Sequence, residues 1–282
     1  MENIVKQIEI EYGFSIKSYA PAPRGFWAET FIINTDKDKY FVKIHKNFPW
    51  ESSLKTSLDI QFQMAEQIKY IPKPIKTQNN MLFYILDDKR IFVLYTYIDG
   101  TQYITNDAYE IFNLMTNIYK LNIKCNAIFE FKFYAEEIIR EMQKNKYDTT
   151  SEILKSFLKR NHEIYMKNWN IYENLVNKVR NKNNKYYLTH GDIGKNLMID
   201  KNKQVFIVDW DRIYVGSIER DLREFIDINT DIKKLNNMAK VAGLDWEFNK
   251  DYHNYFILNG LYYNLRTLFF GVNEEWTTEG LI

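Results

Sequence analysis

The 282-residue sequence has a single cysteine, Cys125, no long apolar run and no block of basic residues. One cysteine excludes an internal disulfide framework and a cysteine metal cluster, and it fits the reducing conditions of the cytoplasm. No run of about 18 apolar residues occurs, and the first residues, MENIVKQIEIEYGF, carry charges without the apolar core of an export signal. We therefore expect a cytoplasmic protein that is neither exported nor membrane-spanning.

Acidic and basic residues nearly balance, with 38 Lys and Arg against 37 Asp and Glu and a net charge of +1. Because no basic stretch is long enough to cover a phosphate backbone, nucleic-acid binding is not expected. The chain is longer than a usual single domain, which favours two lobes. It shows no internal repeat and no low-complexity linker, and nothing in it indicates an oligomeric state.

The first part of the chain alternates apolar and polar residues in the manner of strands, with helical spacing in two places. The predicted order is a helix, three strands, a second helix and two strands, over residues 2–12, 15–20, 29–34, 40–45, 52–69, 81–86 and 91–97. Pro72 and Pro74 stop the second helix. The turn signal Asp99-Gly100 predicts a boundary between an N-terminal lobe, 1–98, and a C-terminal lobe, 99–282.

The rest of the chain has mostly helical spacing. Helices are predicted over residues 107–121, 131–144, 151–178, 218–228 and 251–270. Short strands interrupt them in the segment 186–221. A small sheet followed by a helical region with a short strand pair predicts an α+β fold.

Two polar clusters in the segment 186–221 carry the chemistry. Asp192 and Asn196 follow one apolar strand, and Asp209 and Asp211 follow the next. If the two strands are neighbours, these side chains converge. Phosphoryl transfer needs such a set, because one acid accepts the proton of the attacking hydroxyl while an Asn and a second Asp hold Mg²⁺ against the nucleotide phosphates.

The motifs His190–Asp192, Asn196 and Val208–Asp211 resemble those of the aminoglycoside phosphotransferase and choline kinase-like family. The segments 26–44 and 208–222 are most similar to its spectinomycin phosphotransferase-like subgroup. The resemblance covers nearly the whole chain and implies the bilobal protein-kinase-like fold, with a small antiparallel-sheet N-terminal lobe carrying one main helix and a larger helical C-terminal lobe.

The resemblance also implies site residues. Asp192 corresponds to the catalytic base, the carboxylate that accepts the proton of the hydroxyl. His190 corresponds to a scaffolding residue. Asn196 and Asp209 correspond to the ligands of Mg²⁺. In the N-terminal lobe, Lys43 is similar to the nucleotide-binding lysine of the third strand. In the family, backbone groups of two residues bind the edge of adenine, and we expect these residues near Thr96 and Ile98.

The sequence departs from the family pattern in the catalytic loop. Three residues separate Asp192 from Asn196, whereas the family has four. Either Gly194 absorbs the shorter turn through its conformational freedom, or Asn196 lies elsewhere. The segment 21–28, in the position of the phosphate-covering loop, contains one glycine, Gly25, and an ordinary hairpin loop is an equal interpretation.

Two other assignments stay open. The acidic partner of Lys43 is not assigned, because the helix offers several acids where the family pattern expects one glutamate: Glu51, Asp59 and Glu66, with Gln61 at the expected position. Asp211 could contact a second metal ion, contact the substrate or bond locally to backbone.

The expected activity is transfer of a phosphate from ATP, or alternatively GTP, to a hydroxyl of a small molecule. The leading acceptor is an aminoglycoside or aminocyclitol antibiotic; choline, homoserine or a sugar are alternatives. Candidate carboxylates for a cationic acceptor lie on the predicted helices, where charges usually face solvent: Glu136, Glu137, Glu224 and Asp227. A kinase-fold protein of the spore-coat type, with little or no turnover, is the alternative from another class.

Overall fold

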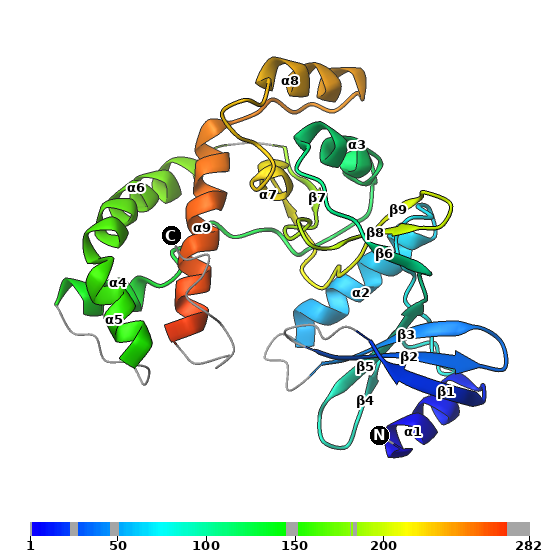
Figure 1. Cartoon of the computed structure of the whole chain (residues 1–282). Helices are drawn as coiled ribbons and strands as arrows, with labels where there is room; N and C mark the ends of the chain where they lie inside the picture. Colours follow the sequence, from blue (N-terminus) through cyan, green and yellow to red (C-terminus); the bar gives the residue numbers. More distant parts are fainter. Residues whose placement is uncertain are drawn as a thin grey trace. The chain divides into compact units, whose positions relative to one another are not determined.

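The computed structural model describes residues 2–22, 28–45, 51–144, 152–180, 182 and 185–269 (Figure 1). Contacts divide the chain into two compact units. Unit 1 comprises Met1–Ile128 and Tyr187–Val215, and unit 2 comprises Phe129–Tyr186 and Gly216–Ile282. Each is described by itself, and the predicted lobes 1–98 and 99–282 stay predictions.

Unit 1 begins with a five-stranded antiparallel sheet and two helices, as predicted. Its strand order is β1-β2-β3-β5-β4. The elements are α1 (Glu2–Tyr12), β1 (Ile16–Pro21), β2 (Ala28–Thr35), β3 (Lys39–His45), α2 (Glu51–Ala65), β4 (Tyr84–Ile85) and β5 (Ile91–Thr96). The predicted strand over 81–86 is shorter than expected, because only two residues pair with β5.

The two faces of this sheet are covered by different helices (Figure 1). Side chains alternate along a strand, so neighbours in β3 point to opposite faces. Val42 and Ile44 pack with Ile4 and Ile8 of α1. Phe41, on the other face, packs in the cluster that holds residues of α2.

The rest of unit 1 adds one helix and five short strands among the described residues. They are β6 (Gly100–Gln102), α3 (Ala108–Tyr119), β7 (Tyr187–Thr189), β8 (Leu197–Asp200), β9 (Val205–Ile207) and β10 (Tyr214–Gly216). β6, β8 and β9 form one antiparallel sheet, and β7 pairs with β10. The strands before the two polar clusters are therefore not paired with each other, because β7 and β9 belong to different sheets.

Unit 2 is helical and has an aromatic core. Its helices are α4 (Glu136–Gln143), α5 (Glu152–Arg160), α6 (His162–Arg180), α7 (Glu219–Leu222), α8 (Ile232–Val241) and α9 (Lys250–Phe269). Tyr172 of α6 stacks on Tyr255 and Tyr262 of α9, with ring centroids 5.6 and 5.1 Å apart. This packing fixes the two longest described helices of unit 2 against each other.

Several helix boundaries differ from those predicted. The helix expected over 151–178 is two helices, because Asn161 lies between α5 and α6 with its side-chain amide donating to the Phe157 carbonyl at 2.9 Å. The helix over 131–144 starts late, after Ala135 in a left-handed conformation. Only α7 forms within 218–228, and α8 was not predicted. Among the described residues, no helix is long and apolar enough to cross a membrane.

Candidate active site

Lys43 lies in the middle of β3 and is buried on the face of the sheet that α2 covers. Its neighbours across the strands are Thr30 on β2 and Val93 on β5. Lys is rarely buried without a partner, because desolvating an ammonium is costly. The position of Lys43 in the centre of the sheet therefore requires nearby negative charge.

Two carboxylates supply that charge. The Lys43 ammonium donates to Asp209 Oδ1 at 2.6 Å and to Asp211 Oδ2 at 2.5 Å. Both acids follow β9, more than 160 residues further along the chain. The structure thus joins the predicted nucleotide-binding lysine to the predicted metal-binding segment.

The two carboxylates differ in exposure. The Asp209 side chain is 44% exposed, whereas the Asp211 side chain is 13% exposed. His45, two residues after Lys43 on the same face, is fully buried, with its Nδ1 4.0 Å from Asp211 Oδ2. Asp211 therefore lies in the interior, and Asp209 lies at the edge of the cluster.

Burial and pairing act in opposite directions on the charges of this cluster. Burial alone would lower the pKa of Lys43, but Asp209 and Asp211 outweigh it, and the net shift is upward. Desolvation would raise the pKa of Asp209, but the Lys43 ammonium lowers it below its usual value. Burial lowers the pKa of His45 to about 4, so its ring is neutral at pH 7. The cluster therefore holds one cation and two anions.

Asp209 has a left-handed backbone, with φ of +64°. For a residue with a side chain this conformation costs about 1 to 3 kcal/mol, and it persists only where the surroundings impose it. Two bonds hold the preceding residue: the Val208 N–H donates to the Asn196 carbonyl at 2.9 Å, and the Val208 carbonyl is 2.8 Å from His190 Nε2. The turn at Asp209 is therefore fixed by the catalytic loop.

His190 links the two polar segments. The Asp192 N–H donates to His190 Nδ1 at 3.2 Å, so the other ring nitrogen carries the proton and donates to the Val208 carbonyl. The ring also contacts the buried Trp210 indole, with centroids 4.5 Å apart. The segments converge through this ring although their strands are not neighbours.

The shortened loop closes on itself. The Asn196 side-chain amide donates to the Asp192 carbonyl at 2.6 Å, and the Asn196 N–H donates to the Ile193 carbonyl at 2.8 Å. The glycine with a left-handed backbone in this turn is Gly191, with φ of +80°, and not Gly194 as expected. Gly191 comes directly before Asp192, the predicted catalytic base, so the loop shortens without a left-handed residue between Asp192 and Asn196.

The donor set fits a magnesium ion. Mg²⁺ prefers oxygen ligands and in phosphotransferases takes one or two carboxylates together with phosphate oxygens and water. Asp209 offers an exposed carboxylate, and the amide nitrogen of Asn196 is used in the loop, which leaves its oxygen for a ligand. In the part of the chain that the structure describes, no group of three or more His, Cys, Asp or Glu side chains could hold a metal by itself.

The sequence matches the model of the phosphotransferase enzyme family over residues 18–235. The match covers well over half of the chain. The chain belongs to this family. It is accordingly a small-molecule phosphotransferase. No curated protein matches the sequence.

Solved structures of low sequence identity share the fold of this phosphotransferase. A spectinomycin phosphotransferase in complex with ADP and spectinomycin is 19% identical, with a TM-score of 0.73 over 97% of this chain and 89% of that chain. Choline kinase LicA from Streptococcus pneumoniae is 13% identical, with a TM-score of 0.63 over 99% and 94%. A microcompartment-associated aminopropanol kinase is 13% identical, with a TM-score of 0.60 over 96% and 88%. The predicted bilobal kinase-like fold is confirmed.

At the end of β5, one of the backbone groups of this phosphotransferase that could bind the edge of adenine is already hydrogen-bonded within the protein. The Thr96 N–H donates to the Lys73 carbonyl at 3.0 Å, and the Thr96 hydroxyl accepts from the Lys73 N–H at 2.9 Å. Thr96 can therefore meet a ligand through its carbonyl but not through its N–H. Ile98 lies two residues further on, outside the strand.

Two of the acids considered as partners of Lys43, Asp59 and Glu66, do not pair with it. Asp59 is exposed, Glu66 pairs with Lys73, and Gln61 donates to the Pro72 carbonyl at 2.7 Å. The side chain of Glu51 and most of the phosphate-covering segment, residues 23–27, lie outside the described part of the chain. The described contact from α2 to the cluster comes from Ser57, whose hydroxyl donates to the Asp211 carbonyl at 3.0 Å.

The acids suggested for a cationic acceptor already have partners within unit 2. Three of them pair with arginines: Glu136 with Arg140 at 2.5 Å, Glu137 with Arg266 at 3.0 Å and Glu224 with Arg223 at 2.7 Å. Asp227 accepts from the N–H of Asn229 at 2.9 Å in a local turn. Surface pairs of this kind contribute little, and they leave less negative charge for a cationic ligand.

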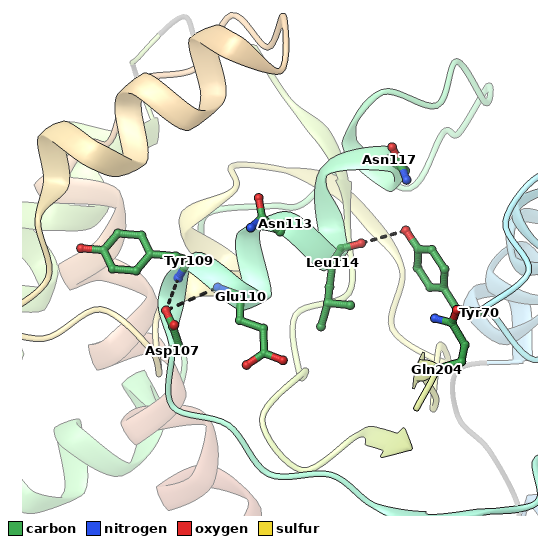
Figure 2. Close-up of a pocket in the computed structure, with 8 residues that line it drawn as sticks. All are labelled: Tyr70, Asp107, Tyr109, Glu110, Asn113, Leu114, Asn117 and Gln204. Carbon is green, nitrogen blue, oxygen red and sulfur yellow. Dashed lines mark hydrogen bonds between the residues drawn. The ribbon is translucent and has the colours of Figure 1, made fainter. Parts of the chain in front are cut away.

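A hollow of about 520 Å³ in unit 1 lies beside α3 and contains no residue of the Lys43 cluster (Figure 2). It is lined by Tyr70, Asp107, Tyr109, Glu110, Asn113, Leu114, Asn117 and Gln204. Several of the polar side chains that line this hollow are already hydrogen-bonded within the fold. Asp107 caps α3, Tyr70 donates to the Leu114 carbonyl at 2.8 Å, and Glu110 accepts from Tyr103 and Thr105.

Sequence reasoning missed two residues of the site, His45 and Ser57, and left the role of a third, Asp211, open. Asp211 had several open roles, and the structure shows it bonded to Lys43. His45 and Ser57 had no assigned role. The period of β3 could have indicated His45, because it lies two residues from Lys43 and so on the same face. No sequence signal identifies Ser57, since its contact is with a residue 154 positions away.

Proposed function

We propose that this chain transfers the γ-phosphate of ATP to a hydroxyl group of a small molecule in a magnesium-dependent reaction. The observation that carries the proposal is the bonding of Lys43 to Asp209 and Asp211, with His190 connecting this cluster to the loop of Asp192. This set contains the types of group that phosphoryl transfer uses: a cation for the phosphates, a carboxylate for the metal and a carboxylate that can act as the base.

Each residue has a distinct task in the reaction. The Lys43 ammonium binds phosphate oxygens of the nucleotide. Asp209 and Asn196 would hold Mg²⁺, which neutralises phosphate charge and orients the transferring group. Asp192 is exposed, so an acceptor hydroxyl can reach it. Its carboxylate orients that hydroxyl and takes its proton as the oxygen attacks the γ-phosphorus.

The nucleotide base fits the end of β5. An adenine presents an amino group and a ring nitrogen on one edge, which suit a carbonyl acceptor and an N–H donor two residues apart. The carbonyl of Thr96 and the N–H of Ile98 have this spacing. Guanine presents a carbonyl where adenine has the amino group, so the same pair favours ATP as donor over GTP.

The acceptor we propose is an aminoglycoside or aminocyclitol. Support comes from the structural similarity to a phosphotransferase that binds spectinomycin. The arginine pairing of Glu136, Glu137 and Glu224 favours an acceptor of low positive charge over a polycationic aminoglycoside. Choline, homoserine and a sugar are the alternative acceptors, and each of them would need a similar site. A role in antibiotic resistance and a location in the cytoplasm stay predictions.

The reaction can be tested at Asp192. Replacing Asp192 with Asn keeps the shape of the side chain and removes its basicity. We expect Asp192→Asn to lower the transfer rate by about 10² to 10⁴-fold, the usual contribution of a general base. The measurement is the product formed from ATP with a panel of aminocyclitols, aminoglycosides, amino alcohols and sugars.

Two controls separate this proposal from a kinase-fold protein without turnover. Asp192→Asn should keep the ADP affinity and melting temperature of the wild type, because Asp192 is exposed. Full activity in the variant would show that Asp192 is not the base. Nucleotide binding by the wild type without transfer to any acceptor in the panel would favour the structural-protein alternative.

A further inference from the structure

We propose that Asp211 is the fixed counter-ion of Lys43, a positioning residue that does the work of an acid on α2 and leaves Asp209 for the metal. The inference rests on the proposed nucleotide site. According to this proposal, Asp211 and Asp209 have different roles because their surroundings differ.

The first argument is burial. Both carboxylates bond to Lys43, but the Asp211 side chain is 13% exposed and the Asp209 side chain 44%. A metal ion arriving with its nucleotide keeps several water molecules and needs an accessible oxygen. Asp209 can meet this need, whereas Asp211 Oδ2 is bonded to the Lys43 ammonium and lies 4.0 Å from His45 Nδ1.

The second argument is how each residue is anchored. The main-chain carbonyl of Asp211 accepts from the Ser57 hydroxyl of α2 at 3.0 Å. This bond ties α2 to the residue that neutralises Lys43. Asp209 instead has a left-handed backbone in a turn held by the catalytic loop. Asp211 is therefore attached to the side of the sheet that carries Lys43, and Asp209 to the loop that carries Asn196.

The third argument is that the described acids of α2 and its C-terminal extension face elsewhere. Asp59 is exposed, and Glu66 pairs with Lys73. Gln61, at the position where the family pattern expects a glutamate, donates to the Pro72 carbonyl. Among the side chains of α2 that the structure describes, the contact to this cluster is that of Ser57 with Asp211.

The stereochemistry of Lys43 suits this division. An ammonium has three N–H donors, and two are used by Asp209 and Asp211. If Asp211 stays bonded, the ammonium keeps a fixed direction while its other donors meet phosphate oxygens. Removing Asp211 should loosen Lys43, and removing Asp209 should remove the metal.

The test measures ADP affinity by calorimetry, once with Mg²⁺ and once with EDTA. We expect Asp211→Asn to weaken ADP about 10-fold in both conditions, because a misdirected Lys43 loses a charge-assisted bond to phosphate. The ratio of the two affinities should stay at the wild-type value. Asp209→Asn should instead bring that ratio close to one. Asp59→Asn is the matched control and should change neither affinity.

A second measurement needs no nucleotide. In the ligand-free protein, Asp211→Asn should lower the melting temperature by about 3 to 8 °C, because it leaves part of a buried charge unpaired. Asp209→Asn should lower it by less than about 2 °C, since the Asp209 side chain is more exposed than that of Asp211. If the wild type bound no ADP at all, the proposed function would fail. The two melting temperatures would still show whether Asp211 stabilises Lys43 more than Asp209 does.

Ser57→Ala gives a milder variant in case Asp211→Asn does not fold. It should weaken ADP about two- to fivefold with and without Mg²⁺, as expected for one lost hydrogen bond. Loss of the Mg²⁺ dependence in Asp211→Asn would make Asp211 a metal ligand and overturn the proposal. Unchanged affinity and melting temperature in both Asp211→Asn and Ser57→Ala would also overturn it.

Discussion

The two faces of the five-stranded sheet are built from alternate residues of the same strands, but they differ in chemistry. On the α1 face, Val42 and Ile44 of β3 belong to a cluster of buried apolar side chains. On the α2 face, Lys43 and His45 interrupt a cluster that is otherwise apolar. The same strand thus contributes to stability with one set of residues and to the site with the other.

This difference shows how a small sheet can keep a buried charge. On the α1 face the charged pair Glu29–Arg90, at 3.7 Å, is partly exposed, while the buried side chains are apolar and provide cohesion for the sheet. The ammonium on the α2 face is supported by acids that come from a distant segment and not from the sheet itself. The site therefore depends on the long-range contact between β3 and the turn after β9.

The largest effect is expected at Lys43. Lys43→Met keeps the length and packing of the side chain and removes its charge. We expect kcat/KM for ATP to fall by at least about 10²-fold, in line with the loss of one electrostatic contact to the reacting phosphates. Steady-state kinetics measures this change, and circular dichroism should show unchanged secondary structure. Activity near that of the wild type would exclude Lys43 from the site.

The opposite face should respond in the opposite way. Ile44 is fully buried against α1. Ile44→Ala should lower the free energy of unfolding by about 2 to 5 kcal/mol through lost burial and the cavity left behind. Denaturant unfolding measures the loss. The KM for ATP of the folded fraction should stay at the wild-type value, and a large rise in KM would show that the two faces are not independent.

The contribution of the α2 face to folding stability should also be the one that depends on acid pH. Burial lowers the pKa of His45 to about 4, whereas an exposed histidine titrates near 6.5. The unfolded chain therefore binds this proton at higher pH than the folded protein does. The contribution of a neutral His45 to stability is complete above about pH 6.5 and is lost as the pH falls towards 4, by up to about 1.4 kcal/mol per pH unit.

Unfolding curves between pH 7.5 and 4.5 can test this dependence. His45→Gln has no titrating ring, so the variant should lose this part of the pH slope. Ile44→Ala on the other face should keep the slope of the wild type although it is less stable. Equal slopes in wild type and His45→Gln would contradict the assignment to His45.

The sequence predicted the sheet and the identity of the chemical groups better than their connections. Local alternation identified β1, β2 and β3 although their burial differs: β1 is mostly exposed, whereas β3 is buried on both faces from Val42 onward. The motif residues Lys43, Asp192 and Asp209 were identified by resemblance. The bond between Lys43 and Asp211 could not be predicted, since it joins residues 168 positions apart and depends on tertiary packing.

The errors in the helical unit have local physical causes. Periodicity continues through Asn161, but its side chain bonds to a carbonyl of the preceding turn and the helix ends there. α8 was overlooked although Asp231 is a favourable N-cap, whose carboxylate accepts from the N–H groups of Lys233 and Lys234. The capping signal was present, and the search for apolar periodicity did not use it.

The smallest effect is expected at the other end of β3, where a second lysine provides the control for Lys43. Lys39 is exposed, and its ammonium lies 5.6 Å from the centre of the Tyr97 ring. Cation–π contacts at exposed positions contribute about 0.5 to 1 kcal/mol. Lys39→Gln should therefore lower the free energy of unfolding by no more than that and leave the KM for ATP unchanged. Unfolding and kinetic measurements on Lys39→Gln and Lys43→Met, side by side, separate burial from charge. If Lys39→Gln raised KM as Lys43→Met does, general electrostatic attraction of the nucleotide would explain the lysine effect, and the buried position of Lys43 would not be needed.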